Sequence, residues 1–102
     1  KACDIVKVKY AVGKIATGDQ FIGDSAVKKR IAEGFAPYCV EMEGAAVGHI
    51  AAKNDVPFVI IRSMSDDADE AVVEKISEKK FDITEYCHTA SEITKRTLEI
   101  LK

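Results

Sequence analysis

Two glutamates flank a methionine at the end of an apolar segment, in the order Val40, Glu41, Met42, Glu43. A carboxylate beside a buried strand is costly unless something pairs with it. A ribose diol is a suitable partner, because one carboxylate accepts hydrogen bonds from both hydroxyls and such charge-assisted bonds are strong. The alternative is a carboxylate at the N-terminus of the next helix, where the helix dipole favours negative charge. Spacing alone leaves both interpretations open.

A second polar cluster, at residues 62–66, follows the most apolar segment of the chain, residues 58–61. Ligands in open α/β sheets bind just beyond the carboxyl ends of the strands, so an arginine, hydroxyls and a carboxylate here could do chemistry. The acidic neighbours Asp67 and Asp69 would raise the pKa of Asp66 by like-charge repulsion, which suits a proton donor. The alternative is an aspartate that caps the following turn.

Other motifs indicate neither a nucleotide-phosphate site nor a metal site. Residues 13–19 have the glycine spacing of a phosphate loop, but Asp19 stands where that loop needs its lysine. Residues 66–70 lack the glycine and the distant bidentate glutamate of a calcium loop. The cysteines and histidines form neither a Cys-x-x-Cys pair nor a pair at metal-ligand spacing. They are Cys3, Cys39, Cys87, His49 and His88.

The composition predicts one small domain with little net charge. The 102 residues, 47% of them hydrophobic, can form one compact core at most, and a net charge of −2 creates no basic field for nucleic acid. No apolar run approaches the roughly 20 residues that span a bilayer, and no signal-peptide pattern is present. We therefore expect a cytoplasmic protein without nucleic-acid or membrane partners. Because the chain opens on Lys1 and its first methionine is Met42, we expect a piece of a longer protein.

Alternating strand and helix patterns would position these residues. Strands are expected at residues 6–12, 38–42 and 58–61, the last as a central parallel strand. Helices are expected from Ser25, which can cap, to Gly34, which can end a helix, and over residues 44–53 and 83–101. Residues 13–19 are expected to form a loop. This alternation predicts the α/β class.

Three segments together resemble the nucleosidase branch of the purine nucleoside phosphorylase-like family. They are residues 17–22, 40–46 and 56–69, and their order and spacing match across residues 12–69. The resemblance implies a three-layer α/β/α nucleoside phosphorylase-type domain, of which residues 1–102 are the C-terminal portion. It also implies hydrolysis of the N-glycosidic bond of 5'-methylthioadenosine and S-adenosylhomocysteine.

The resemblance implies roles for residues around the adenine base. Phe21 is similar to the aromatic residue that stacks on adenine, and the backbone of Ile22 to the group that reads the base edge. Asp66 resembles the general acid that protonates N7 of adenine, and Ser65 would orient its carboxyl group. Arg62 is similar to an arginine that organises carboxylates around the sugar and water.

The resemblance also implies contacts to the sugar. Glu43 resembles the carboxylate that holds the ribose hydroxyls, and Met42 would pack against the sugar. Glu41 would shape the same pocket, and Val40 belongs to the same substrate-binding segment. Phe81 is a candidate for the aromatic residue that closes over the thio-substituted end of the substrate.

The family's water-activating glutamate lies near its N-terminus and is not in this chain, so a complete site would need the missing half. The resemblance implies a homodimer that needs no metal or organic cofactor. A phosphorylase of the same fold is one alternative, although only lysines stand where related phosphorylases carry a phosphate-binding arginine. A non-catalytic nucleoside-binding module is another, and Asp66 argues against it. The lysines are Lys75, Lys79 and Lys80.

Overall fold

The computed structural model describes residues 1–80 and 82–102, so the prediction for Phe81 lies outside the described residues. The chain divides into two compact units, which are described separately. Unit 1 contains residues 1–12, 61–65 and 82–102. Unit 2 contains residues 13–60 and 66–80.

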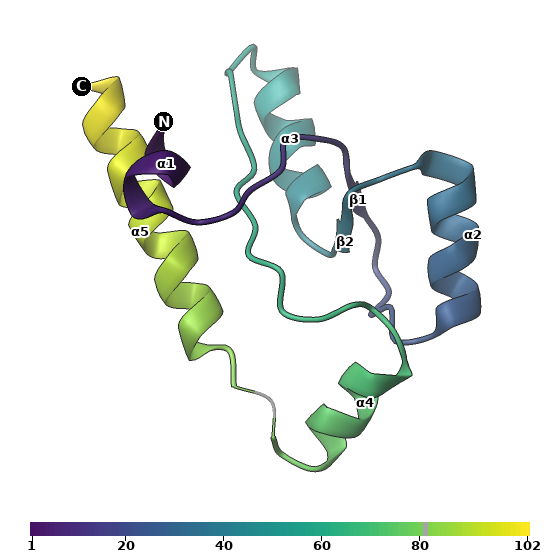
Figure 1. The fold of residues 1–102 in the computed structure, drawn as a ribbon. Coiled ribbons are helices and arrows are strands. Elements are labelled where there is room, and N and C mark those ends of the chain that lie inside the picture. Colours follow the sequence, from purple (N-terminus) through teal and green to yellow (C-terminus); the bar gives the residue numbers. More distant parts are fainter. Residues whose placement is uncertain (81) are drawn as a thin grey trace. The chain divides into compact units, whose positions relative to one another are not determined.

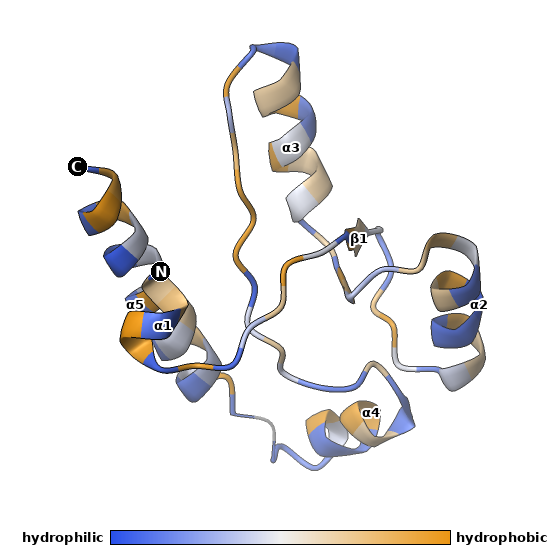
Figure 2. Cartoon of the chain, turned by 45° about the horizontal axis from the view of Figure 1, so that its top comes forward, coloured by the Kyte–Doolittle hydropathy of each residue, from blue (hydrophilic) through white to orange (hydrophobic). Residues whose placement is uncertain are grey.

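Unit 2 is built around two parallel strands, β1 (Ile15–Thr17) and β2 (Cys39–Glu41). Parallel strands need a crossover connection, and α2 (Ser25–Phe35) lies within it. Helix α3 (Gly44–Lys53) follows β2 and contacts β1. In both Figure 1 and Figure 2, α2 and α3 lie on opposite sides of the strands. The predicted α/β class is therefore confirmed, and α3 has the predicted bounds.

The ends of α2 differ from the prediction by one or two residues. Asp24, and not Ser25, is the N-cap residue, and its carboxylate accepts two backbone N–H groups of the first turn, both at 2.9 Å. Gly34 lies inside the helix, whose last residue is Phe35 and whose C-cap residue, Ala36, is in the left-handed conformation with φ 46°. The capping signals in the sequence therefore predict the position of this helix correctly, but its N-cap and C-cap residues differ from the predicted ones.

The last element of unit 2 is α4 (Glu70–Ser77), which the sequence analysis did not predict. Asp69 caps it, because its carboxylate accepts the backbone N–H of Ala71 at 3.1 Å. Val72 is the one fully buried large apolar residue among the described residues, with 2% of its surface exposed. Part of the acidic stretch is thus the start of a helix, where the dipole favours negative charge.

The predicted strand at residues 6–12 is wrong. In unit 1, α1 (Ala2–Val6) ends where that strand was expected to begin. Lys7 adopts the left-handed conformation with φ 59°, and the backbone N–H of Val8 donates to Cys3 O at 3.1 Å. These bonds close the helix, whereas an alternating apolar pattern forms a strand only where a neighbouring strand supplies ladder hydrogen bonds.

Helix α5 (Thr84–Leu101) is the other element of unit 1 and packs against α1. Its first residue is one position beyond the predicted start, and the carboxylate of Asp82 accepts the backbone N–H of Thr84 at 2.9 Å. Figure 2 shows hydrophobic and hydrophilic residues interspersed along its ribbon, in keeping with the three- and four-residue spacing of its apolar positions. Neither α5 nor another helix of the described residues is long and apolar enough to cross a membrane.

Residues 58–61 form no strand, contrary to prediction. Residues 56–67 carry no helix or strand assignment, although much of this segment is apolar (Figure 2). The sheet of the described residues consists of β1 and β2 alone. A strand exists only when paired, so an apolar run without a paired neighbour does not form one.

Candidate active site at the carboxyl ends of the strands

Strands β1 and β2 end side by side. Thr17 and Glu41 are their last residues and are partners in the register of the sheet. The backbone N–H of Gly18 donates to Glu41 O at 3.1 Å, which continues the ladder by one bond. Two of the three segments singled out from the sequence therefore leave the sheet at one edge, where ligands bind in α/β proteins.

Glu41 is turned into the protein and is only 8% exposed. Its carboxylate accepts the backbone N–H of Glu43 at 3.1 Å and that of Gly44 at 2.9 and 2.7 Å. The hydroxyl of Thr17 donates to Oε1 of the same carboxylate and accepts the backbone N–H of Ala45 at 3.0 Å. Glu41 is thus the carboxylate at a helix N-terminus that the sequence left as an alternative.

Glu43 and Met42 lie on the solvent side of this turn. Glu43 is the N-cap residue of α3 but makes no side-chain capping bond, and its side chain is exposed. Met42 is 42% exposed, whereas Val40, the middle residue of β2, is half-buried. Glu43 is therefore the carboxylate of this segment that a ligand in solution can reach.

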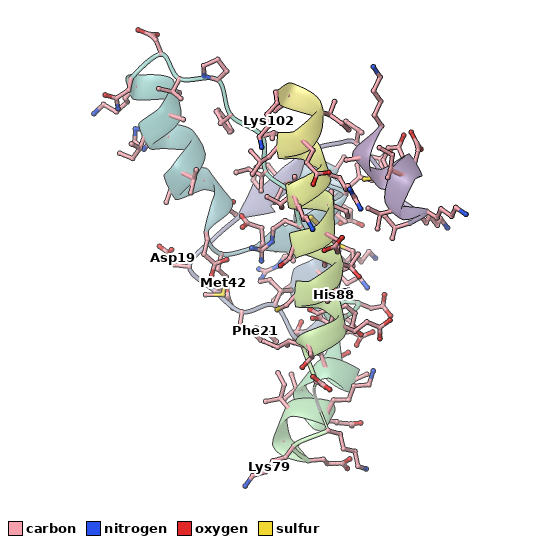
Figure 3. The ribbon with its side chains drawn as sticks, turned by 90° about the vertical axis from the view of Figure 1, so that its left-hand side faces the viewer. Asp19, Phe21, Met42, Lys79, His88 and Lys102 are labelled. Carbon is pink, nitrogen blue, oxygen red and sulfur yellow. The ribbon has the colours of Figure 1, made fainter. Side chains whose placement is uncertain are left out.

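Phe21 and Ile22 belong to the loop between β1 and α2. Phe21 is 51% exposed and Ile22 is half-buried. A Cβ atom added to Gly23 would lie 2.5 Å from Cγ2 of Val73, so only glycine lets this loop lie so close to α4. Figure 3 shows Phe21 and Met42 within one region of unit 2. The structure therefore leaves the ring of the predicted stacking residue accessible.

A pair of hydrogen bonds links the starts of α2 and α4. The carboxylate of Glu70 accepts the backbone N–H of Ser25 at 2.9 Å and its hydroxyl at 2.6 Å. These bonds lower the pKa of Glu70 from 4.5 to about 2. We call this pair the Ser25–Glu70 latch. It ties the loop that carries Phe21 to the helix that follows Asp66.

Asp66 is half-buried at the start of the acidic loop. Its Oδ1 atom accepts the backbone N–H of Ala68 at 2.8 Å, and Ala68 has φ 55°. This is the turn-capping arrangement given as the alternative for Asp66, and it fixes the direction of the carboxyl group. The role of Asp66 as a proton donor stays a prediction.

Two of the remaining predicted residues belong to unit 1. Arg62 is exposed and Ser65 is half-buried, and both lie in the segment of unit 1 that precedes Asp66. Their grouping with the residues of unit 2 stays a prediction. Among the described residues, no three His, Cys, Asp or Glu side chains gather as metal ligands would.

Sequence reasoning missed Thr17, Ser25 and Glu70 as residues that shape this region. The sequence does offer a signal for Thr17, because this hydroxyl residue comes directly before Gly18 and a loop. The bond between Ser25 and Glu70 spans 45 positions, and no local pattern announces it. Packing within unit 2 brings these two residues together.

The fold of the chain matches that of solved structures. Its structure matches the native structure of futalosine hydrolase of Helicobacter pylori strain 26695 with a TM-score of 0.84 and 31% sequence identity. The match covers 96% of this chain and 41% of that chain. The chain therefore has the nucleoside phosphorylase-type fold that the resemblance implied.

Sequence comparison identifies the family. The family model of the Phosphorylase superfamily matches residues 1–99, so the chain belongs to this family. It is 43% identical over 89 residues to the 5'-methylthioadenosine/S-adenosylhomocysteine nucleosidase of Treponema pallidum (strain Nichols). This match covers 87% of this chain and 33% of that protein. It is 38% identical over 89 residues to the aminodeoxyfutalosine nucleosidase of Campylobacter jejuni, covering 87% and 36%. The chain thus spans about a third of the length of these relatives.

Proposed function

We propose that the protein containing this chain hydrolyses the N-glycosidic bond of 5'-methylthioadenosine and S-adenosylhomocysteine, releasing adenine and the thio-ribose. The observation that carries the proposal is the 43% identity to the Treponema nucleosidase, which extends over 87% of this chain. The exposed Glu43 and Phe21 support it, because a ribose diol needs an accessible carboxylate and a base needs an accessible ring.

In this proposal the chain supplies the groups that bind the nucleoside and the proton donor. Phe21 stacks on adenine, the backbone of Ile22 hydrogen-bonds the base edge, and Glu43 accepts both ribose hydroxyls, with Met42 packed against the sugar. Stacking tolerates different bases, so the hydrogen bonds to the base edge and the ribose would provide most of the specificity.

Bond cleavage would begin with proton transfer from Asp66 to N7 of adenine, so that the base leaves as a neutral molecule. As the bond to C1′ lengthens, positive charge develops on the sugar, and nearby carboxylates stabilise it electrostatically. Ser65 would orient the carboxyl group of Asp66, and Arg62 would hold the carboxylates around the sugar in place. Water would then attack C1′.

The general base for that water would come from a glutamate outside this chain. We place residues 1–102 in the C-terminal part of a single domain, in a homodimer located in the cytoplasm and acting in methionine salvage. No metal or organic cofactor is needed, because proton transfer and electrostatic stabilisation suffice for this reaction.

The test is adenine release by the full-length protein that contains this chain. With 5'-methylthioadenosine as substrate, we expect adenine to form at the same rate with and without orthophosphate, together with free 5-methylthioribose. Formation of a ribose 1-phosphate that depends on orthophosphate would instead identify a phosphorylase. Binding of the nucleoside without any release of adenine would identify a non-catalytic binding module.

A second candidate substrate is a futalosine-type nucleoside. It is favoured by the likeness to the Campylobacter aminodeoxyfutalosine nucleosidase and to the Helicobacter futalosine hydrolase. Values of kcat/KM for aminodeoxyfutalosine, 5'-methylthioadenosine and S-adenosylhomocysteine, measured on one preparation, rank the candidates directly.

A further inference from the structure

We infer that Thr17 and Glu41 form a positioning pair that sets the direction of the ribose-binding residues Met42 and Glu43. The inference rests on the proposed function, in which Glu43 accepts the ribose hydroxyls. It gives a role to Thr17, which the proposed mechanism does not use. It also changes the role of Glu41 from shaping the pocket directly to holding its neighbours.

The pair joins the end of the sheet to the start of α3. The Thr17 hydroxyl donates to Glu41 Oε1 and accepts the backbone N–H of Ala45, while the Glu41 carboxylate accepts the N–H groups of Glu43 and Gly44. The carboxylate is almost fully buried, at 8% exposure. Hydrogen bonds to a buried charge are strong and costly to remove, so this turn has one well-defined geometry.

This geometry controls Met42 and Glu43 because they lie inside the turn that the pair closes. Glu41 is fixed in the sheet by its pairing with Thr17, and the N–H groups after Met42 are fixed by the Glu41 carboxylate. A Cβ atom on Gly44 would lie 2.9 Å from Glu41 Oε1, so the turn leaves no space for a side chain there. Because the pair fixes the backbone of this turn, it also sets the direction of the exposed Glu43 side chain.

The base-binding loop is held by different contacts. Phe21 and Ile22 lie next to Gly23, which packs against Val73 of α4, and the latch of Ser25 to Glu70 closes the same loop. Loss of the Thr17 hydroxyl should therefore disturb the ribose contacts more than the base contacts. This difference separates a positioning role from a general role in stability, which would weaken both.

The experiment measures binding to full-length protein carrying Asp66→Asn, so that bound nucleoside is not cleaved. Into this parent we introduce Thr17→Val, which keeps the shape but removes the hydroxyl, and separately Thr17→Ser, which keeps the hydroxyl. Calorimetry gives Kd for 5'-methylthioadenosine and for adenine. For Thr17→Val we expect Kd for the nucleoside to rise about tenfold and Kd for adenine to change less than about twofold. Thr17→Ser should bind both like the parent.

Equal losses of nucleoside and adenine affinity, or no loss in Thr17→Val, would overturn the positioning role. If Thr17→Val does not fold, Glu41→Gln provides the second variant. The glutamine side chain has an NH2 group in place of one carboxylate oxygen, and this group cannot accept the hydrogen bonds that the oxygen accepts. It should show the same selective loss for the nucleoside. If the Asp66→Asn parent binds 5'-methylthioadenosine no more tightly than adenine, the ribose contributes no affinity. That result would contradict the proposed function, and the positioning role with it.

Discussion

Glu41 and Glu43 are chemically identical carboxylates two positions apart, yet the structure gives them different environments. Glu41 is buried at the end of β2 and accepts backbone N–H groups of the turn, whereas Glu43 is exposed. Residues two positions apart would lie on the same side of a continuing strand, but β2 ends at Glu41 and Glu43 is already the N-cap residue of α3, so the backbone turns between them. The two interpretations left open by the sequence thus apply to different residues: Glu41 is the helix-terminal carboxylate and Glu43 remains the ribose candidate.

Asp66 provides the sharpest prediction at the scale of single residues. In the full-length protein, we expect Asp66→Asn to lower kcat by about 10²–10⁴-fold while Kd for the nucleoside changes little, because only the proton donor is lost. The asparagine side-chain oxygen can still accept the backbone N–H of Ala68, so the turn should persist. Single-turnover adenine release and calorimetry measure the two quantities.

Asp55→Asn is the matched control, since Asp55 is an exposed carboxylate that takes no part in the proposed mechanism. It removes the same charge elsewhere on the chain and should leave kcat within about twofold. Turnover of Asp66→Asn equal to that of the control would show that the proton comes from elsewhere.

At the scale of elements, the latch between Ser25 and Glu70 is the contact that brings two of the candidate segments together. It links the first residue of α2 to the first residue of α4. The loop with Phe21 precedes α2, and the loop with Asp66 precedes α4. Base recognition and proton donation would therefore depend on one contact between helix ends.

This latch predicts a pH-dependent contribution to stability. Folding lowers the pKa of Glu70 from 4.5 to about 2, so the folded state favours the ionised carboxylate. The stabilisation is fully present above pH 4.5 and is lost as the pH falls towards about 2. We expect Ser25→Ala to lower the urea midpoint of the full-length protein at pH 7, and this difference from the parent to shrink between pH 4.5 and pH 2.

Glu74→Gln serves as the control for this measurement, because it removes a carboxylate from the same helix without touching the latch. Its effect on the urea midpoint should be small at both pH values, as for most exposed charges. A difference between Ser25→Ala and the parent that stays constant down to pH 2 would show that Glu70 ionisation does not support the contact.

At the scale of the whole molecule, the chain exposes apolar side chains that protein cores usually bury. In unit 2, Val47 is 57% exposed, Ile50 62% and Val59 72%. The relatives are more than twice as long, since the matched part of this chain covers 33% of the Treponema protein. In the proposed protein, further segments of the same domain would cover these side chains and supply the water-activating glutamate.

This proposal predicts that the groups held by residues 1–102 do not suffice for catalysis. A polypeptide of these residues should release no adenine from 5'-methylthioadenosine above the buffer rate, because the proposed general base for the water lies outside these residues. The full-length protein at equal concentration is the positive control. The opposite result would be adenine release by the short polypeptide, lost when Asp66→Asn is introduced into it. That result would place the general base inside this chain and contradict the mechanism.

The sequence by itself determined the features that depend on neighbouring residues. Small side chains and a following Asn-Asp-Val-Pro segment set the bounds of α3, and apolar spacing placed α5 to within one residue. The order of the three motif segments was enough to identify the fold and the family, which the match over residues 1–99 confirms. These signals are local because helices form their own hydrogen bonds within the segment.

Only the tertiary structure decided the features that need distant partners. β2 lies within the predicted strand at residues 38–42, but residues 6–12 and 58–61 form no strand despite their strand-like patterns, and β1 forms within residues 13–19, which were predicted to be a loop. A strand requires hydrogen bonds from a neighbour that its own sequence does not specify. In the same way, Thr17 meets Glu41 and Ser25 meets Glu70 across 24 and 45 positions. Which of the two carboxylates, Glu41 or Glu43, is buried, and which hydroxyl donates to it, depends on the packing of the sheet against α3.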